Sequence, residues 1–232
     1  MKSFIPSDNK RKLRIAFIAS TGGSVYRETC RRSPWLKDRV SLVITDRDCG
    51  AGTAAHELNH PVEQIAYRSA RQFSEETYGI LTRYQIDLAI TFFTRILVEP
   101  LISGFNGRLI NLHPSLLPAC PGLRGFEDSI KSGARIIGTT VHFVSAKLDE
   151  GPPILQSCIH RANNESTESL RHRIFEQQCR SLLQIAHWFE ADRITASGDF
   201  VRISGAEITS GDFSPALDAE DAIALFESSS AC

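Results

Sequence analysis

The feature of this sequence that most restricts its fold is an alternation of short apolar, β-branched runs with longer helical segments. Buried strands are predicted at residues 13–19, 41–46, 87–93 and 107–113, with a weaker one at 61–67. Helices are predicted between them, at 22–32, 52–58 and 74–84, the last opening on Ser74 as N-cap with acidic residues in its first turn. The alternation indicates the α/β class: a twisted, mostly parallel sheet of Rossmann-like topology with helices on both faces.

The carboxyl ends of strands in such a sheet share one rim, where ligands bind. The predicted strands bring residues 20–24, 91–95 and 111–113 to this rim. A site is therefore expected there.

The second half of the chain has a different pattern. Strands are predicted at 138–146 and 152–160, joined as a hairpin, and an amphipathic helix runs from about 166 to 189. After Arg202 come six acidic residues and no Lys or Arg, which indicates a short helix at 218–227 on a loosely held tail. We therefore expect a single domain over residues 1–203, with a first half at about 13–110 and a second half at about 111–203. An acidic C-terminal tail follows at 204–232.

Composition excludes several classes of protein. The formal net charge of −1 gives no electrostatic basis for a nucleic-acid or membrane surface. The six cysteines are scattered without metal-ligand spacing, which favours reduced thiols and no bound metal. The charged N-terminus lacks an apolar core segment. We expect a cytoplasmic protein, a monomer or homodimer, whose partners are small molecules.

The stretch INLHPSLLP carries two polar residues into the end of a predicted strand. Asn111 and His113 are one position apart and project from the same face of an extended chain. Asp149 lies in the Gly- and Pro-rich turn of KLDEGPP, and a carboxylate near an imidazole favours its charged form and fixes its orientation. An amide beside them can donate to a developing oxyanion. Such a set without an activated nucleophile suggests direct transfer through a tetrahedral intermediate. The alternative is that Asn111 caps a turn and His113 is a satisfied core histidine.

These motifs resemble the folate-dependent formyltransferase family. NLHPSLLP is followed by PGLRG, GTTVHFV and LDEGPPILQ, in an order and spacing similar to those of the glycinamide ribonucleotide transformylases. The resemblance implies a formyltransferase that uses 10-formyltetrahydrofolate as co-substrate and Asn111, His113 and Asp149 as catalytic residues. It also implies that the half at about 13–110 binds the acceptor and that the half at about 111–203 binds folate and carries out catalysis. In that family the acceptor amine attacks the formyl carbon directly.

The resemblance also implies a folate-binding segment. TRIL matches the family's folate-binding loop at Arg95, Ile96 and Leu97, although Thr94 departs from its methionine, and Val144 closes the GTTVHFV motif on the same side. His142 in that motif is expected to support the structure.

The acceptor side departs from the transformylase pattern. Gly22, Gly23 and Ser24 are retained from the family's phosphate-binding loop, but Val25 replaces an asparagine. Two glycines here fit a tight strand-to-helix turn as well as an anion-binding loop. Gln178 stands where the family places a glutamate against the acceptor amine. Two further departures are Phe175, at a polar contact position, and the segment 124–127, which is histidine-rich and basic in the transformylases.

These departures leave the acceptor open. They favour a hydroxyornithine-like amine, as in siderophore pathways, with phosphoribosylglycinamide of purine biosynthesis as the alternative. An alternative of another class is an inactive folate- or nucleotide-binding protein.

Overall fold

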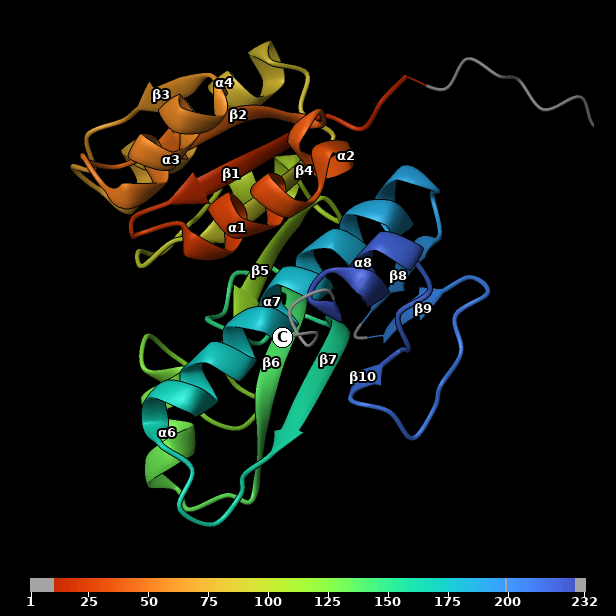
Figure 1. Cartoon of the computed structure of the whole chain (residues 1–232). Helices are drawn as coiled ribbons and strands as arrows, with labels where there is room; N and C mark the ends of the chain where they lie inside the picture. Colours follow the sequence, from red (N-terminus) through yellow and green to blue (C-terminus); the bar gives the residue numbers. More distant parts are fainter. Residues whose placement is uncertain (1–10, 199, 228–232) are drawn as a thin grey trace, which may run out of the picture.

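A computed structural model describes residues 11–198 and 200–227 of the chain; the predictions for 1–10, 199 and 228–232 lie outside these residues. An eight-stranded sheet forms the centre, in the order β10-β7-β6-β5-β4-β1-β2-β3 (Figure 1). Five strands are parallel: β1 (Ile15–Ala19), β2 (Val40–Thr45), β3 (Val62–Gln64), β4 (Leu88–Phe92) and β5 (Leu109–His113). Three antiparallel strands extend it: β6 (Ile136–Phe143), β7 (Pro153–His160) and β10 (Phe213–Ser214). The predicted α/β fold and the hairpin are confirmed.

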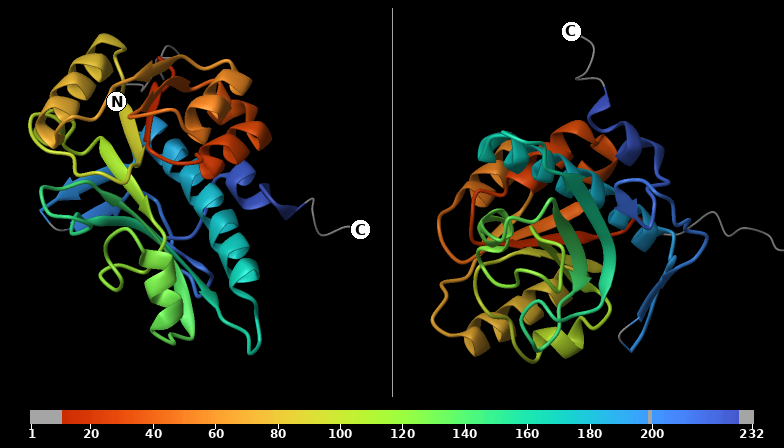
Figure 2. Two further views of the ribbon diagram at one scale, coloured as in Figure 1. Left: turned by 90° about the vertical axis from the view of Figure 1, so that its left-hand side faces the viewer. Right: turned by 90° about the horizontal axis from the view of Figure 1, so that it is seen from below.

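Helices cover both faces of the sheet because the buried strands place apolar residues on each side. In β1, Ile15 and Phe17 pack into one core cluster, whereas Ala16 and Ile18 pack into the other. The side view in Figure 2 (left) shows the sheet between these layers. The first layer contains α1 (Ser24–Arg32), α3 (Gly50–Leu58) and α7 (Thr167–Glu190), and the second contains α4 (Ala70–Arg83) and α5 (Leu101–Gly104). Two short helices are α2 (Pro34–Lys37) and α6 (Gly125–Lys131).

One helix start was predicted wrongly. Helix α4 begins at Ala70, and its N-cap is Ser69, whose hydroxyl accepts from the Gln72 N–H. Ser74 lies inside the helix and is buried, and its hydroxyl accepts from the Val98 N–H at 2.9 Å. The candidate cap is therefore used in a tertiary contact.

The expectation of a loosely held C-terminal tail was also wrong for the described residues. After the two-stranded sheet β8 (Ile194–Ser197) and β9 (Phe200–Ile203), the chain adds β10 to the edge of the main sheet and then forms α8 (Glu220–Ala224). Leu225 and Phe226 are buried. Whether the domain itself ends at 203 stays a prediction, as does its division into two halves.

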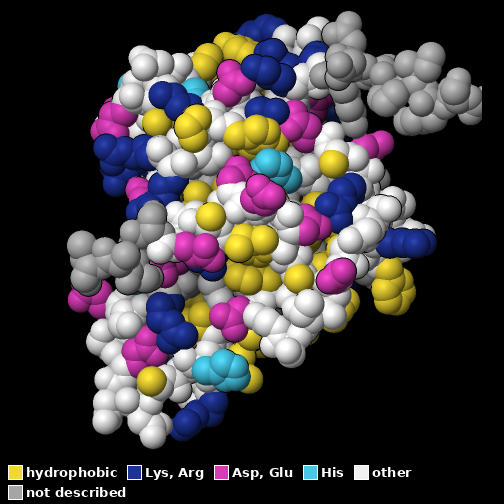
Figure 3. Space-filling view, turned by 45° about the vertical axis from the view of Figure 1, so that its right-hand side comes forward, with side chains coloured by type: hydrophobic (Ala, Val, Ile, Leu, Met, Phe, Trp, Pro, Cys, Tyr) yellow, Lys and Arg dark blue, Asp and Glu magenta, His cyan; other side chains and the backbone are white. Residues whose placement is uncertain are grey.

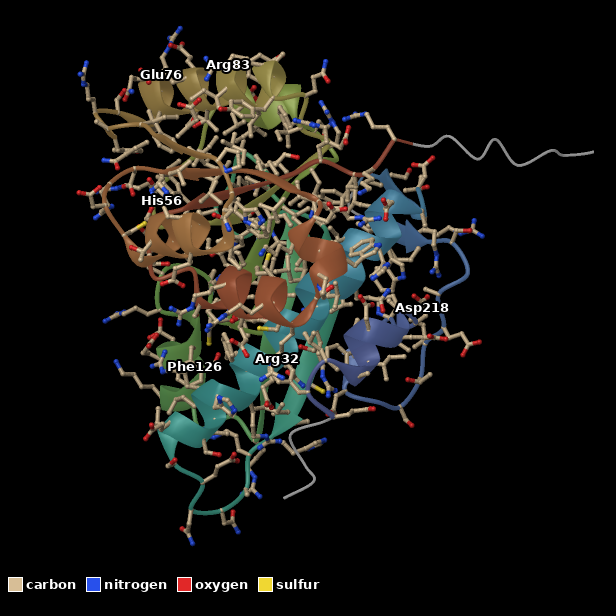
Figure 4. All side chains as sticks on the ribbon, turned by 45° about the horizontal axis from the view of Figure 1, so that its top comes forward. Arg32, His56, Glu76, Arg83, Phe126 and Asp218 are labelled. Atoms are coloured by element: carbon tan, nitrogen blue, oxygen red, sulfur yellow. The ribbon has the colours of Figure 1, made fainter. Side chains whose placement is uncertain are left out.

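Asp218 fastens the segment before α8 to the end of α7 (Figure 4). Its carboxylate accepts from Gln184 at 2.8 Å and from the buried indole of Trp188 at 3.0 Å, and it pairs with Arg193 at 2.7 Å. An acidic residue of this segment is therefore an internal partner of α7 and Arg193.

The surface carries mixed charge. On the face in Figure 3, Lys and Arg side chains are interspersed with Asp and Glu side chains. Within residues 11–198 and 200–227, no helix has the length and apolar character needed to span a membrane.

Candidate active site

The three residues predicted as catalytic converge at the end of β5. His113 is the last residue of that strand, and Asp149 lies in the turn between β6 and β7. His113 Nδ1 is 3.5 Å from Asp149 Oδ2, and both side chains are at most 7% exposed. His113 Nε2 lies 2.9 Å from the Cys120 carbonyl, which can only accept, so Nε2 carries a proton. A second proton on Nδ1 would make His113 a cation opposite the Asp149 carboxylate.

A second histidine fixes the orientation of Asn111. His142 Nδ1 donates to the Phe143 carbonyl at 2.9 Å, which leaves Nε2 of the neutral ring as an acceptor. The Asn111 amide nitrogen lies 3.2 Å from this Nε2, and Asn111 Oδ1 accepts from the Thr91 hydroxyl at 3.0 Å. If the Asn111 amide were flipped, its Oδ1 would face His142 Nε2, and two acceptors would lie against each other. One Asn111 N–H is thus used, and the other remains available to a ligand.

The charge state of His142 agrees with this arrangement. Burial lowers the pKa of His142, although the Phe143 carbonyl and the charge of Asp149 act in the opposite direction. The ring is therefore neutral near pH 7 and serves as an acceptor. The expectation that His142 supports the structure fits these contacts, since its ring holds the amide of Asn111.

The turn that carries Asp149 is held by backbone contacts. Asp149 has φ of 54°, in the left-handed region, and its Oδ2 accepts from the Gly122 N–H at 2.7 Å. Gly151 packs so closely that a Cβ there would lie 1.7 Å from the Phe143 carbonyl oxygen. The Gly-rich turn therefore brings the carboxylate close to both histidines.

Two cavities meet at these residues. The larger, of about 860 Å³, and the smaller, of about 130 Å³, share Phe93, Asn111, Leu148 and Asp149 in their walls. His113, which was expected to be either a catalytic residue or a satisfied core histidine, lines the larger cavity. Ser115 is buried, and its hydroxyl donates to the Ala119 and Cys120 carbonyls, so it is not an activated nucleophile.

The residues expected to bind folate line the smaller cavity. They are Arg95, Ile96, Leu97 and Val144, which face Asn111, His142 and Asp149 across it. Arg95 is also held on its other side by a contact with Asp46. The structure thus brings the whole expected folate group together.

The residues expected to bind the acceptor are brought together less completely. Ser24 and Gln178 line the larger cavity. Gly23 instead forms the N-cap of α1 with φ of 61°, and a Cβ there would lie 2.7 Å from Ala51 Cβ, so it makes a tight turn packed on α3. Gly22 is exposed beside it, and Val25 points into the core.

Sequence reasoning singled out the segment 124–127 but missed Glu168, Arg171 and His172 of α7, which also line the larger cavity. Arg171 pairs with Glu127 at 2.9 Å, and its guanidinium lies 4.3 Å over the Phe126 ring. His172 and Glu168 lie on the same wall. Their helical spacing on α7 was visible in the sequence, but only the fold shows which side faces the cavity. Among the described residues no group of His, Cys, Asp and Glu could hold a metal.

Comparisons with known proteins agree with this site. The profile of the family described as "Formyl transferase" matches residues 13–185. Phosphoribosylglycinamide formyltransferase of Mycobacterium tuberculosis (strain H37Rv) is 31% identical over 205 residues, which cover 85% of this chain and 94% of that protein. The Escherichia coli enzyme of the same name is 33% identical over 187 residues, 78% of this chain and 88% of its own length.

Solved structures give the same relation. Glycinamide ribonucleotide transformylase 1 from Symbiobacterium toebii superposes with a TM-score of 0.76 at 32% identity, covering 83% of this chain and 94% of that one.

Another sequence relative is much longer than this chain. The chain spans 17% of the length of the human trifunctional purine biosynthetic protein adenosine-3, to which it is 29% identical over 179 residues. This chain therefore belongs to the formyl transferase family and is a formyltransferase.

Proposed function

We propose that the protein transfers the formyl group of 10-formyltetrahydrofolate to the amine of phosphoribosylglycinamide. The observation that carries the proposal is the convergence of Asn111, His113 and Asp149 where the two cavities meet. The relatives named above support the choice of acceptor, since their names specify phosphoribosylglycinamide or glycinamide ribonucleotide.

The smaller cavity fits the folate co-substrate chemically. Phe93, Leu97 and Val144 give apolar walls suited to a flat ring, and Arg95 adds a cation for an anionic tail. When bound, 10-formyltetrahydrofolate supplies the formyl group. Its position in the smaller cavity would put that group beside the wall shared with the acceptor cavity.

The three polar residues have separate roles in this proposal. Asn111 donates its free amide N–H to the formyl oxygen as negative charge develops there. His113 holds a proton at Nδ1, and Asp149 stabilises the resulting imidazolium. Asp149 then accepts a proton released by the acceptor amine, directly or through water. As the bond between the formyl carbon and the donor nitrogen breaks, this proton passes to the leaving nitrogen, so that the formylated acceptor and tetrahydrofolate are the products.

A hydroxyornithine-like amine is the second candidate acceptor, on evidence from this chain alone. Among the described residues that line the larger cavity, Arg171 is the only Lys or Arg, and it is already paired with Glu127. Val25 is buried, and Phe175 and Gln178 add no charge. A phosphate group would therefore depend on backbone N–H groups at the start of α1 or compete with Glu127 for Arg171.

Turnover of the purified protein with 10-formyltetrahydrofolate tests the proposal. Phosphoribosylglycinamide and N-hydroxyornithine are compared by kcat/KM, with His113→Asn as the inactive control. A higher kcat/KM for phosphoribosylglycinamide supports the proposal, and a higher value for hydroxyornithine supports the second candidate. Tight folate binding without turnover of any amine would contradict both and favour a binding protein.

A further inference from the structure

Asp46 is a buried charge outside the catalytic group. It directly follows β2, and its side chain is only 1% exposed. Arg47 forms a two-pronged pair with it, at 3.0 Å from Nε to Oδ1 and 2.5 Å from Nη2 to Oδ2. Arg95 approaches from the segment after β4, with Nε 3.4 Å from Oδ2. Burial opposes ionisation, but Arg47, Arg95 and the Ser20 hydroxyl hold the pKa of Asp46 below its usual range.

These contacts hold one wall of the smaller cavity. Arg95 crosses the end of β1 to reach Asp46, because β1 lies between β4 and β2 in the sheet. The Arg95 guanidinium also lies 4.8 Å over the Tyr67 ring, and the Thr94 N–H donates to the Ser20 hydroxyl at 3.5 Å. The segment with Arg95, Ile96 and Leu97 is thus tied to the end of β2.

The cluster carries excess positive charge beside the smaller cavity, which Arg95 lines. Two guanidinium groups share one carboxylate, and the side chains of Arg47 and Arg95 are 47% and 43% exposed. The contact with Asp46 uses Nε of Arg95, and its terminal nitrogens have no hydrogen-bond partner within the described part of the chain. A carboxylate ligand can therefore pair with them in two-pronged geometry.

We propose that Asp46 is a positioning residue that fixes the Arg95 guanidinium to receive the carboxylates of the folate glutamate tail. The inference rests on the proposed function, because it takes 10-formyltetrahydrofolate as the ligand. Asp46 itself acts through Arg95 and does not contact the reacting atoms.

Calorimetric binding tests the inference without turnover. The two probes are 5-formyltetrahydrofolate, which has the glutamate tail, and 5-formyltetrahydropteroate, which lacks it. Asp46→Asn is expected to raise the Kd of the first about tenfold, equivalent to about 1.4 kcal/mol, and to leave the second unchanged. In an Arg95→Gln background the effect of Asp46→Asn should vanish, since neighbours that act as a unit are non-additive.

A matched control is Glu63→Gln. Glu63 pairs with Arg83 at 2.7 Å near the edge of the same sheet and lines neither cavity, so both Kd values should stay unchanged. Thermal melting of each variant reports whether it is folded. If Asp46→Asn does not fold, Asp46→Glu keeps the charge but displaces it, and the same glutamate-specific loss is expected.

The outcomes separate the two proposals. If Asp46→Asn raised the Kd of both probes equally, Asp46 would only shape the cavity. If the variant bound the glutamate probe more tightly, the Asp46 carboxylate would compete with the ligand for Arg95. Either result overturns the inference. If the wild-type protein bound the glutamate probe but formylated no amine, this would contradict the proposed function alone. A loss confined to the glutamate probe supports Asp46 as the positioning residue.

Discussion

Gly151 offers a direct test of how the active-site turn is held. A Cβ at this position would lie 1.7 Å from the Phe143 carbonyl oxygen, whereas real Cβ contacts essentially never fall below 3.0 Å. Gly151→Ala therefore forces a displacement of at least about 1.3 Å in the turn or in the end of β6. Because Gly151 does not have positive φ, the effect comes from this contact and not from backbone strain.

The displacement acts on two contacts of the candidate active site. The Phe143 carbonyl accepts from His142 Nδ1, which in turn orients Asn111, and Asp149 lies two residues before Gly151. A shift of about 1 Å in a catalytic group can cost roughly 100-fold. We therefore expect kcat to fall by at least about 100-fold, or about 2.7 kcal/mol in activation free energy.

The assay is steady-state formyl transfer at saturating substrates, with thermal melting to show that the variant is folded. Gly79→Ala is the matched control, because Gly79 lies inside α4 and a Cβ there has nothing within 4 Å. The control should keep full kcat and gain about 0.5–1 kcal/mol of stability. A folded Gly151→Ala variant with kcat within about threefold of wild type would refute the reasoning.

Three further predictions follow from contacts described above. Asp149→Asn keeps an oxygen for the Gly122 N–H but removes the charge opposite His113, so kcat should fall about 10²–10⁴-fold; unchanged kcat in steady-state assays would argue against proton transfer at this pair. Burial also lowers the pKa of His60, as it does for His142, so the unfolded chain binds protons more readily and the free energy of unfolding should decline as pH falls below about 6.5. Each of these two histidines contributes at most about 1.4 kcal/mol per pH unit to the change in the free energy of unfolding. When urea unfolding is measured from pH 7.5 to 5, this free energy should depend on pH less steeply in His142→Asn than in wild type. Equal pH dependence would contradict a lowered pKa of His142. Asp218→Ala leaves the buried Trp188 indole N–H unpaired and should cost about 1–3 kcal/mol in urea unfolding with kcat retained, whereas unchanged stability would show that the C-terminal segment is not fastened there.

Local patterns indicated that Asn111, His113 and Asp149 could lie close together, as the structure has them, and their catalytic role stays a prediction from the family resemblance. The two-residue period of a strand puts Asn111 and His113 on one face, and the Gly- and Pro-rich turn marks where Asp149 can leave the hairpin. Both features depend on residues close together in the chain. The fold class followed from the same short-range alternation.

Features set by distant contacts could not be predicted in this way. The segment after residue 203 is polar and acidic, yet Asp218 finds Gln184 and Trp188 about thirty residues earlier in the chain. Ser74 was a plausible helix cap in the sequence, but in the structure its hydroxyl accepts from the Val98 N–H of a later segment. The Arg171–Glu127 pair likewise joins residues 44 positions apart, which lie on two different helices.

The shared wall between the two cavities has a kinetic consequence. Asn111 and Asp149 border both spaces, so donor and acceptor can occupy the protein together and meet without a covalent carrier between them. Such an arrangement requires a ternary complex. Double-reciprocal plots at several fixed donor concentrations should then intersect, whereas parallel lines would indicate a formylated enzyme that releases its first product before the acceptor binds.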